Sequence, residues 1–471
     1  MTELCDRPAV ELRHLLLAKD VSAREVLDAH LQRIAEVNPT VNAIVTSTAE
    51  RAMERAQQVD DASARSGEPV GTLHGLPVAH KDLVETRGIR TTYGCAVYAD
   101  HVPDVDALLV ERYRDAGAVL VGKTNTPEFG AGSHTRNAVF GVTANPFDPS
   151  RSAGGSSGGA AAALATGMLP IADGSDMGGS LRNPASFCDV VGLRPSYGLV
   201  PNWPAATAFF PYVTLGGMGR TAADVALQLQ VLAAPDARGP VHMPSAAQFA
   251  QPLDRDFTGV VVAVDADLDG LPVDADVAGV FAGVVPELET LGMVVRESTP
   301  GWADADDAFL TWRGWYQAFT LGDLVDAHPD EVGPNIRWNV DQGRQVTAAD
   351  LMRAERQRMA VFHRVREFLT EHEFLVCPVN QVAPFDADLW HPTDVAGEPV
   401  RHYLDWMRAC SRVTVASLPA ASVPFGYTDA GLPVGVQVVG RPGADLEVLR
   451  FAHALSARTT RRRPAVLGVA G

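Results

Sequence analysis

From residue 70 onward, short apolar segments alternate with helical and glycine-rich segments, and this alternation restricts the fold more than any other feature of the chain. Strands are expected at 76–79, 118–121, 260–264, 293–295 and 374–377, and helices at 105–116, 159–166, 274–290, 348–371 and 445–457. Strands that alternate with helices along a chain favour a sheet that is covered by helices. The sequence therefore predicts an α/β protein.

The first 65 residues differ from the rest and are expected to form a helical lead-in. The segment Ser22-Ala23-Arg24-Glu25 has the pattern of a capping box, and apolar residues follow it at helical spacing. This helix is expected to end before Asn38-Pro39. A second, charged helix is expected over 47–64, and residues 61–69 are expected to form a linker to the α/β part.

The composition limits the function classes that the chain can belong to. The formal net charge is −18, and because a nucleic-acid-binding protein needs a basic face, nucleic-acid binding is not expected. The five cysteines form no CxxC pair and the histidines form no HExxH motif, so neither a disulfide framework nor a metal site is expected. The N-terminus lacks the apolar region of a signal peptide, and no segment is long and apolar enough to span a bilayer. These features predict a cytoplasmic protein that does not insert into membranes.

Two well-known motifs match the sequence by letter but not by context. Residues 117–124 fit the phosphate-loop pattern GxxxxGK[ST], but the four middle residues are themselves an expected strand, and Pro127 follows where a helix should continue. Residues 154–158 contain GxSxG, the pattern of a nucleophile elbow. An elbow needs a strand directly before its serine, and the proline-containing segment 145–149 is unsuited to a strand. Neither motif is expected to have its usual function here.

Three segments carry the residues best suited to catalysis: 75–83, 154–159 and 174–182. Gly178 and Gly179 precede Ser180, and without Cβ atoms the backbone can turn several N–H groups toward a reacting oxygen. Lys81 follows an apolar segment, and burial would lower the pKa of its amine so that the neutral form can act as a base. The neighbouring His80 would point the opposite way on a strand and is expected to pack or to form a hydrogen bond.

Together, these segments resemble the amidase signature family, which includes fatty acid amide hydrolase and the glutamine-hydrolysing subunit of tRNA amidotransferases. The resemblance is close over 70–200, including 122–130 and 183–185, and then fades until the segment 431–437. It implies the amidase-signature fold, with a mixed β-sheet core that is covered by helices on both faces. Residues 1–65 are then the N-terminal helical lead-in and 66–471 the amidase domain. Within that domain, we expect core motifs at 70–200, a variable substrate region at 201–400 and a closing segment at 401–471.

The resemblance implies a Ser–Ser–Lys triad. By motif position Ser180 is the nucleophile, Ser156 the bridging serine that follows a cis peptide bond, and Lys81 the base. The oxyanion would lie against N–H groups of the nucleophile loop: Met177, Gly178, Gly179 and Ser180. Supporting residues, which fix the loops and the lysine by hydrogen bonds, would be Ser157, Ser175, Asp176 and Arg182. A triad of this kind needs neither a metal nor an organic cofactor.

The substrate is less well defined by the sequence. The small loop Gly130-Ala131-Gly132 would leave room near the nucleophile. Five aromatic residues either border the cleft or pack in the core: Phe209, Phe210, Trp312, Trp315 and Tyr316. Apolar or aryl amides are therefore favoured. Because family members also cleave esters and some carbamates, a urethane is a candidate too. The expected enzyme is a monomer or a homodimer that acts on a small-molecule amide or carbamate.

Departures from the commonest family pattern keep other functions open. Ser175, Met177 and Leu181 stand where members often have Thr, Thr and Ile, and Met177 makes that wall of the oxyanion site more apolar. Asn183 stands where the amidotransferase subunit often has Gln, which weakens the alternative of a glutamine-hydrolysing subunit with a partner chain without removing it. Two further alternatives are a binding protein that has kept the fold and an α/β-hydrolase that uses Ser156 with a histidine.

Overall fold

The computed structural model describes residues 2–241, 243 and 246–468 of the chain. The α-helices are α1 (Thr2–Asp6), α2 (Ala9–Ala18), α3 (Ala23–Val41), α4 (Ala49–Ser66), α5 (Leu108–Asp115), α6 (Gly158–Ala165), α7 (Arg182–Phe187), α8 (Ala222–Leu232), α9 (Ala275–Phe281), α10 (Val284–Thr290), α11 (Ala305–Ala327), α12 (Pro334–Arg344), α13 (Ala348–Glu371), α14 (Arg408–Val415) and α15 (Asp445–Ser456). The strands are β1 (Ile44–Ser47), β2 (Pro77–Lys81), β3 (Val119–Thr124), β4 (Arg136–Asn137), β5 (Gly141–Val142), β6 (Ile171–Asp176), β7 (Val191–Arg194), β8 (Thr214–Gly219), β9 (Val261–Val264), β10 (Val294–Glu297), β11 (Phe374–Pro378), β12 (Asp394–Val395), β13 (Glu398–Pro399), β14 (Ala420–Tyr427) and β15 (Pro433–Gly440). Short 3₁₀ helices lie at Ala96–Tyr98, Glu128–Gly130, Ala246–Ala250, Asp405–Met407 and Ala465–Leu467.

One large sheet forms the centre of the protein. Its 11 strands follow the order β1-β3-β2-β6-β8-β7-β14-β15-β11-β9-β10. Strands β3, β2 and β6 pair in parallel, and so do β11, β9 and β10 at the other end. The pairs between β6 and β11 are antiparallel. The prediction of a mixed sheet is therefore confirmed.

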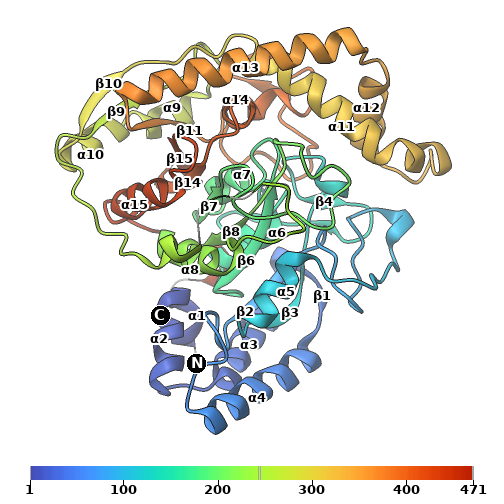
Figure 1. Ribbon diagram of the computed structural model, residues 1–471, viewed down its shortest axis with the longest axis vertical. Helices are drawn as coiled ribbons and strands as arrows, with labels where there is room; N and C mark the ends of the chain where they lie inside the picture. The colour runs from blue at the N-terminus through green and yellow to red at the C-terminus, as the bar shows by residue number, and fades with distance from the viewer. Residues whose placement is uncertain (1, 242, 244–245, 469–471) are drawn as a thin grey trace.

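The two faces of this sheet pack against different helices. Along β9, Val262 and Val264 belong to a core that includes residues of α8, α10 and α15, whereas Ala263 belongs to a second core with residues of α11, α13 and α14. Neighbouring side chains of a strand point to opposite faces of a sheet, so helices cover both faces, as predicted. Figure 1 shows α11, α12 and α13 gathered at one end of the molecule and α1 to α4 at the opposite end.

The lead-in differs from the prediction in where its helices end. Helix α3 begins at the predicted capping box, where Ser22 and Glu25 exchange hydrogen bonds, but it continues through Pro39 to Val41. Pro39 lies in the last turn, and the side chain of Asn38 accepts the N–H groups of two residues beyond the helix, Ala43 and Ile44. Helix α4 extends to Ser66, so the first part of the expected linker is helical.

Strand β1 was not expected, and it joins the lead-in to the edge of the main sheet. It pairs with β3, where Ser47 lies opposite Gly122. A Cβ atom on Gly122 would lie 2.0 Å from the carbonyl oxygen of Thr46, so only glycine allows the two backbones to come this close. Strand β3 also contains three of the four middle residues of the phosphate-loop pattern, Val119 to Val121, whereas Ala118 lies just before the strand.

The later elements agree closely with the expected ones, with one exception. Helix α13 spans the predicted 348–371, and strand β11 follows it at the predicted place. The single helix expected over 274–290 is instead two helices, α9 and α10, which are separated at Ala282 and Gly283. Among the described residues, no helix combines the length and apolar character that a membrane span requires.

Candidate active site

Lys81 is the last residue of strand β2, which lies between β3 and β6, and its side chain is fully buried. Its Nζ lies 2.7 Å from Ser156 Oγ. Two more hydroxyl oxygens lie near Nζ, Ser157 Oγ at 2.9 Å and Ser175 Oγ at 3.1 Å. The first two segments that the sequence marks for catalysis and the start of the third therefore meet around one buried amine.

Burial determines the protonation of this amine. It lowers the pKa of Lys81 to about 7, and the negative charges of Asp173 and Asp176 oppose the shift only in part. Asp173 also accepts the backbone N–H of Lys81 at 2.9 Å and contacts Nδ1 of His80 on the neighbouring position of the strand. His80 is thus a buried, hydrogen-bonded residue, as the sequence predicts. Near neutral pH a large fraction of the lysine is unprotonated and can accept a proton.

Ser156 lies in the glycine-rich loop that precedes α6, and the peptide bond between Gly155 and Ser156 is cis. No strand leads into it, since residues 153–155 lie outside the helices and strands. A Cβ atom on Gly159 would lie 2.4 Å from the backbone nitrogen of Asn125. The hydroxyl of Ser156 lies beside Lys81 rather than a histidine. The arrangement therefore differs from a nucleophile elbow with a Ser–His pair.

Ser180 lies in the loop that joins β6 to α7, and it is 7% exposed. Its carbonyl oxygen accepts the N–H of Ser157 at 3.1 Å, which ties this loop to the Ser156 loop. Among the described residues, no hydrogen bond joins the hydroxyls of Ser156 and Ser180. A Cβ atom on Gly178 would lie 2.9 Å from the Phe309 ring, so the loop fits against α11 only because this residue is glycine.

The N–H groups of this loop are not equivalent. The N–H of Gly179 donates to Asp176 Oδ1 at 2.9 Å, so it is engaged within the protein. The N–H groups of Met177, Gly178 and Ser180 donate to no other group in the described part of the chain. These three donors remain for a reacting oxygen, whereas the sequence expectation also included the N–H of Gly179.

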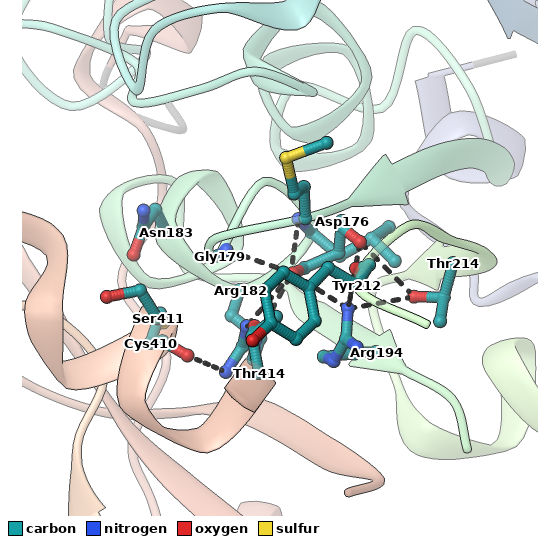
Figure 2. A network of polar contacts seen from close by, with 12 residues as sticks. Asp176, Gly179, Arg182, Asn183, Arg194, Tyr212, Thr214, Cys410, Ser411 and Thr414 are labelled. Atoms are coloured by element: carbon teal, nitrogen blue, oxygen red, sulfur yellow. Dashed lines mark hydrogen bonds and ion pairs between the residues drawn. The ribbon is translucent and has the colours of Figure 1, made fainter. Parts of the chain in front are cut away.

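A fully buried ion network holds the loop in place (Figure 2). Arg182 donates to both carboxylate oxygens of Asp176, at 3.0 and 2.9 Å. Arg194 donates to the backbone carbonyl of Asp176 at 2.8 Å, and its Nη1 lies 3.5 Å from Asp176 Oδ1. Burial by itself would raise the pKa of Asp176, but the two guanidinium groups outweigh it and hold this pKa well below its usual range. The carboxylate thus stays ionised and fixes the loop.

The same network reaches the C-terminal part of the chain, which sequence analysis linked to the site only by resemblance. Arg182 donates to the carbonyl of Cys410 at 3.1 Å, to Thr414 Oγ1 at 2.9 Å and to Gln437 Oε1 at 2.6 Å. Gln437 belongs to the family-like segment 431–437, so the sequence did contain a motif that could have identified this residue as part of the site. Nothing in the sequence singled out Arg194 or Thr414.

The loop Gly130-Ala131-Gly132 lies beside the serine loop. A Cβ atom on Gly130 would lie 3.3 Å from Ser156 Oγ. The carbonyl of Ala131 accepts Asn335 Nδ2 at 3.2 Å, which anchors the loop to the start of α12. The structure therefore brings this loop near Ser156, whereas the sequence expectation placed it near the nucleophile Ser180.

A cavity of about 670 Å³ lies between the segment 206–212 and helices α11 and α13. Its lining is mainly aromatic and aliphatic and includes four of the five expected aromatic residues: Phe209, Phe210, Trp312 and Trp315. Tyr212 also lines it and stacks on Phe309, with ring centroids 5.8 Å apart. Phe309 in turn packs at Gly178, so the rings of Tyr212 and Phe309 stand between the cavity and the nucleophile loop. Tyr316, the fifth aromatic residue, stacks on Phe210 at 4.4 Å.

Comparisons with known proteins agree with this geometry. The family model described as Amidase matches residues 25–449. An acylamidase of Rhodococcus erythropolis is 35% identical over 450 residues, which are 94% of each chain. A glutamyl-tRNA(Gln) amidotransferase subunit of Symbiobacterium thermophilum is likewise 35% identical, over 95% of each chain. The solved structure of a bacterial aryl acylamidase has a TM-score of 0.89 at 28% identity and covers 96% of each chain. The chain therefore belongs to the amidase family, the amidase-signature hydrolases that act on amide C–N bonds.

Proposed function

We propose that the protein is a serine hydrolase that cleaves aryl or apolar amides through an acyl-enzyme on Ser180. The observation that carries this proposal is the buried amine of Lys81, which lies 2.7 Å from Ser156 Oγ and has its pKa lowered to about 7. A neutral amine beside a hydroxyl can act as a general base for that hydroxyl.

In the proposed mechanism, protons move along a chain of two serines. Lys81 takes the proton of Ser156, and Ser156 takes the proton of Ser180 once the Ser180 hydroxyl turns toward it. Ser180 Oγ then attacks the carbonyl carbon, and the oxyanion is stabilised by the N–H groups of Met177 and Gly178 and of Ser180 itself.

The same relay completes the reaction. The proton returns through Ser156 to the leaving nitrogen, because an unprotonated amide anion is a very poor leaving group. Water then enters the vacated position, loses a proton to the relay and hydrolyses the ester at Ser180. Ser157 and Ser175 hold the amine of Lys81 in this scheme, and no step requires a metal or an organic cofactor.

We propose an aryl or apolar substrate because an aromatic cavity lies behind the Tyr212 and Phe309 rings that pack at the nucleophile loop. The names of the similar acylamidase and aryl acylamidase support this choice. A carbamate has the same carbonyl and leaving amine, so an aryl urethane is included in the proposal. We further propose that the enzyme works in the cytoplasm as a monomer or homodimer, without nucleic acid or a membrane.

A second candidate function is glutamine hydrolysis within an amidotransferase complex, which the 35% identity to a glutamyl-tRNA(Gln) amidotransferase subunit favours. This function would require a partner chain. Glutaminase activity that appears only with a co-purified partner, together with no anilide hydrolysis, would support it over the first proposal.

The proposal is tested by measuring aniline release from an anilide and from an N-aryl carbamate ester that frees the same aniline. We expect Ser180→Ala to lower kcat by at least about a thousandfold on either substrate while the protein stays folded. Faster release from the carbamate would make urethane hydrolysis the leading description. Unchanged activity in Ser180→Ala would refute the assignment of the nucleophile.

A further inference from the structure

A buried cluster of hydrogen-bond donors lies where α11, α12 and the segment before α14 meet. Arg313 of α11 and Tyr403 are 5% and 4% exposed. Arg313 Nη2 donates to the hydroxyl of Tyr403 at 2.7 Å, and Asn339 Nδ2 of α12 donates to the same hydroxyl at 2.7 Å. The hydroxyl oxygen therefore accepts two hydrogen bonds, and its own proton is left to donate.

In the described part of the chain, this cluster lacks an anionic partner. Arg313 Nε is buried without a hydrogen-bond partner, and in the described part of the chain no carboxylate lies within ion-pair distance of this guanidinium. Arginine stays positively charged in proteins, and a buried charge without a counterion is strongly unfavourable. Two other arginine side chains near the nucleophile, Arg182 and Arg194, are just as deeply buried. Both contact the carboxylate of Asp176. Arg313 thus differs from them in having no anion of the protein.

The cluster faces the nucleophile loop. Arg313 Nη1 lies 2.8 Å from the sulfur of Met177, three residues before Ser180. A thioether is only a weak acceptor, and the unbranched methionine side chain adapts easily to new surroundings. Met177 is also one of the two residues, with Ser175, where this chain departs from a threonine that is common in the family pattern. A substrate oxygen that displaces the sulfur would meet Arg313 within a short distance of the reacting carbonyl.

We infer that Arg313 and Tyr403 bind a carboxylate of the substrate, so that the enzyme acts on amides that carry an acidic group near the scissile bond. This inference rests on the proposed function and narrows its substrate class. The planar guanidinium suits the two oxygens of a carboxylate, and the Tyr403 hydroxyl adds a third donor. We assign the apolar part of the molecule to the aromatic cavity, whose residues Trp312 and Trp315 belong to the same helix α11 as Arg313.

The test compares substrates that differ only in this charge. On the acyl side, succinanilic acid is compared with the neutral methyl ketone levulinanilide. On the amine side, 4-acetamidobenzoate is compared with 4-acetamidobenzamide. The ratio of kcat/KM between acid and neutral substrate is measured for the wild type, Arg313→Met and Arg313→Lys. Arg353→Met is the control, because Arg353 is a half-exposed residue of α13 that pairs with Asp307 and Asp350.

We expect the wild type to favour the acid of one pair by at least about tenfold, as one charge-assisted hydrogen bond would give. Arg313→Met should bring that ratio close to one while it changes the neutral substrate little, and Arg313→Lys should restore part of the preference. A ratio near one in the wild type for both pairs, or an equal preference in Arg313→Met, would overturn the inference. A purely structural role of Arg313 would lower all four rates together.

A binding measurement separates this inference from the proposed function. In the Ser180→Ala background, calorimetry measures the affinity for the preferred acid, or for both acids if neither is cleaved. Arg313→Met should weaken that affinity at least about tenfold. Absence of Ser180-dependent amine release from all four substrates would count against the proposed function alone. Unchanged affinity on loss of Arg313 would reject the carboxylate site whatever the turnover.

Discussion

Replacing Lys81 with methionine should make the protein more stable at acidic pH, although it removes the proposed base. Burial lowers the pKa of Lys81 from 10.5 to about 7. This difference corresponds to about 5 kcal/mol against the protonated amine in the folded protein. Methionine removes this unfavourable free energy. It also leaves each of three serine hydroxyls without one hydrogen-bond partner, at a loss of about 1 kcal/mol each. Below pH 7 we therefore expect Lys81→Met to be about 2 kcal/mol more stable than the wild type.

The sign of this difference changes with pH. Between pH 7 and 10.5 the unfolded wild-type chain binds a proton that the folded protein has released, so wild-type stability rises with pH. The rise is about 1.4 kcal/mol per pH unit for a single group. Lys81→Met lacks this group and does not share the rise. Its advantage should vanish near about pH 8.5 and become a deficit above that value.

Urea unfolding followed by tryptophan fluorescence at pH 6 and pH 9 measures both free energies. Ser180→Ala is the matched control, because it is equally expected to be inactive but keeps Lys81 and so should keep the wild-type dependence on pH. If Lys81→Met is destabilised by the same amount at both pH values, the pKa of Lys81 is not lowered. The reasoning that makes it a base near neutral pH would then be wrong.

Three further predictions concern the same site. The kcat/KM for anilide hydrolysis should rise about tenfold from pH 6 to a plateau above pH 8, because a neutral base is required; a flat profile in a pH-rate series would contradict this. Gly179→Ala should destabilise the protein by more than about 1 kcal/mol in urea unfolding, because φ is +119° and the new Cβ would lie 2.6 Å from Asn183 Nδ2. Gly270→Ala, at a φ of +82° with open space around it, gives the backbone contribution alone, and equal losses would refute the role of the contact. Arg182→Met should lower the free energy of unfolding by about 3–5 kcal/mol, because it removes a buried partner of Asp176, and a loss below 1 kcal/mol would disprove the importance of that pair.

Local pattern was enough to predict much of the sheet and its covering helices. The strands at 76–79 and 118–121 and the helix at 348–371 carry clear apolar periodicity, so each is encoded within a short window. Strand β1 has four residues and only one buried side chain. It exists because β3 offers a glycine at the point of contact, and such a partner more than 70 positions away leaves no local signal.

The residues of the site likewise fall into those that a local motif predicts and those that no local pattern predicts. Lys81, Ser156 and Ser180 were identified because each lies in a motif, and the structure places their segments together. Sequence analysis did not predict the cluster of Arg313, Tyr403 and Asn339. All three residues lie in the variable region or the closing segment. No spacing rule connects residues that come from two helices and a loop, since their proximity is created only by packing.

Strands β14 and β15 lie in the middle of the main sheet although they are nearly the last to be synthesised (Figure 1). β15 also carries Gln437, which accepts a hydrogen bond from the arginine that braces the nucleophile loop. A chain still emerging from the ribosome thus has β1, β3, β2, β6, β8 and β7 on one side and β11, β9 and β10 on the other before it has the two strands that join them. The two parallel ends must wait for these strands to join them, and such long-range pairing is slow. We therefore expect the ability to hydrolyse amides to appear late and in a single step, once these strands have paired. A chain whose synthesis is incomplete should be inactive toward amides in the cell.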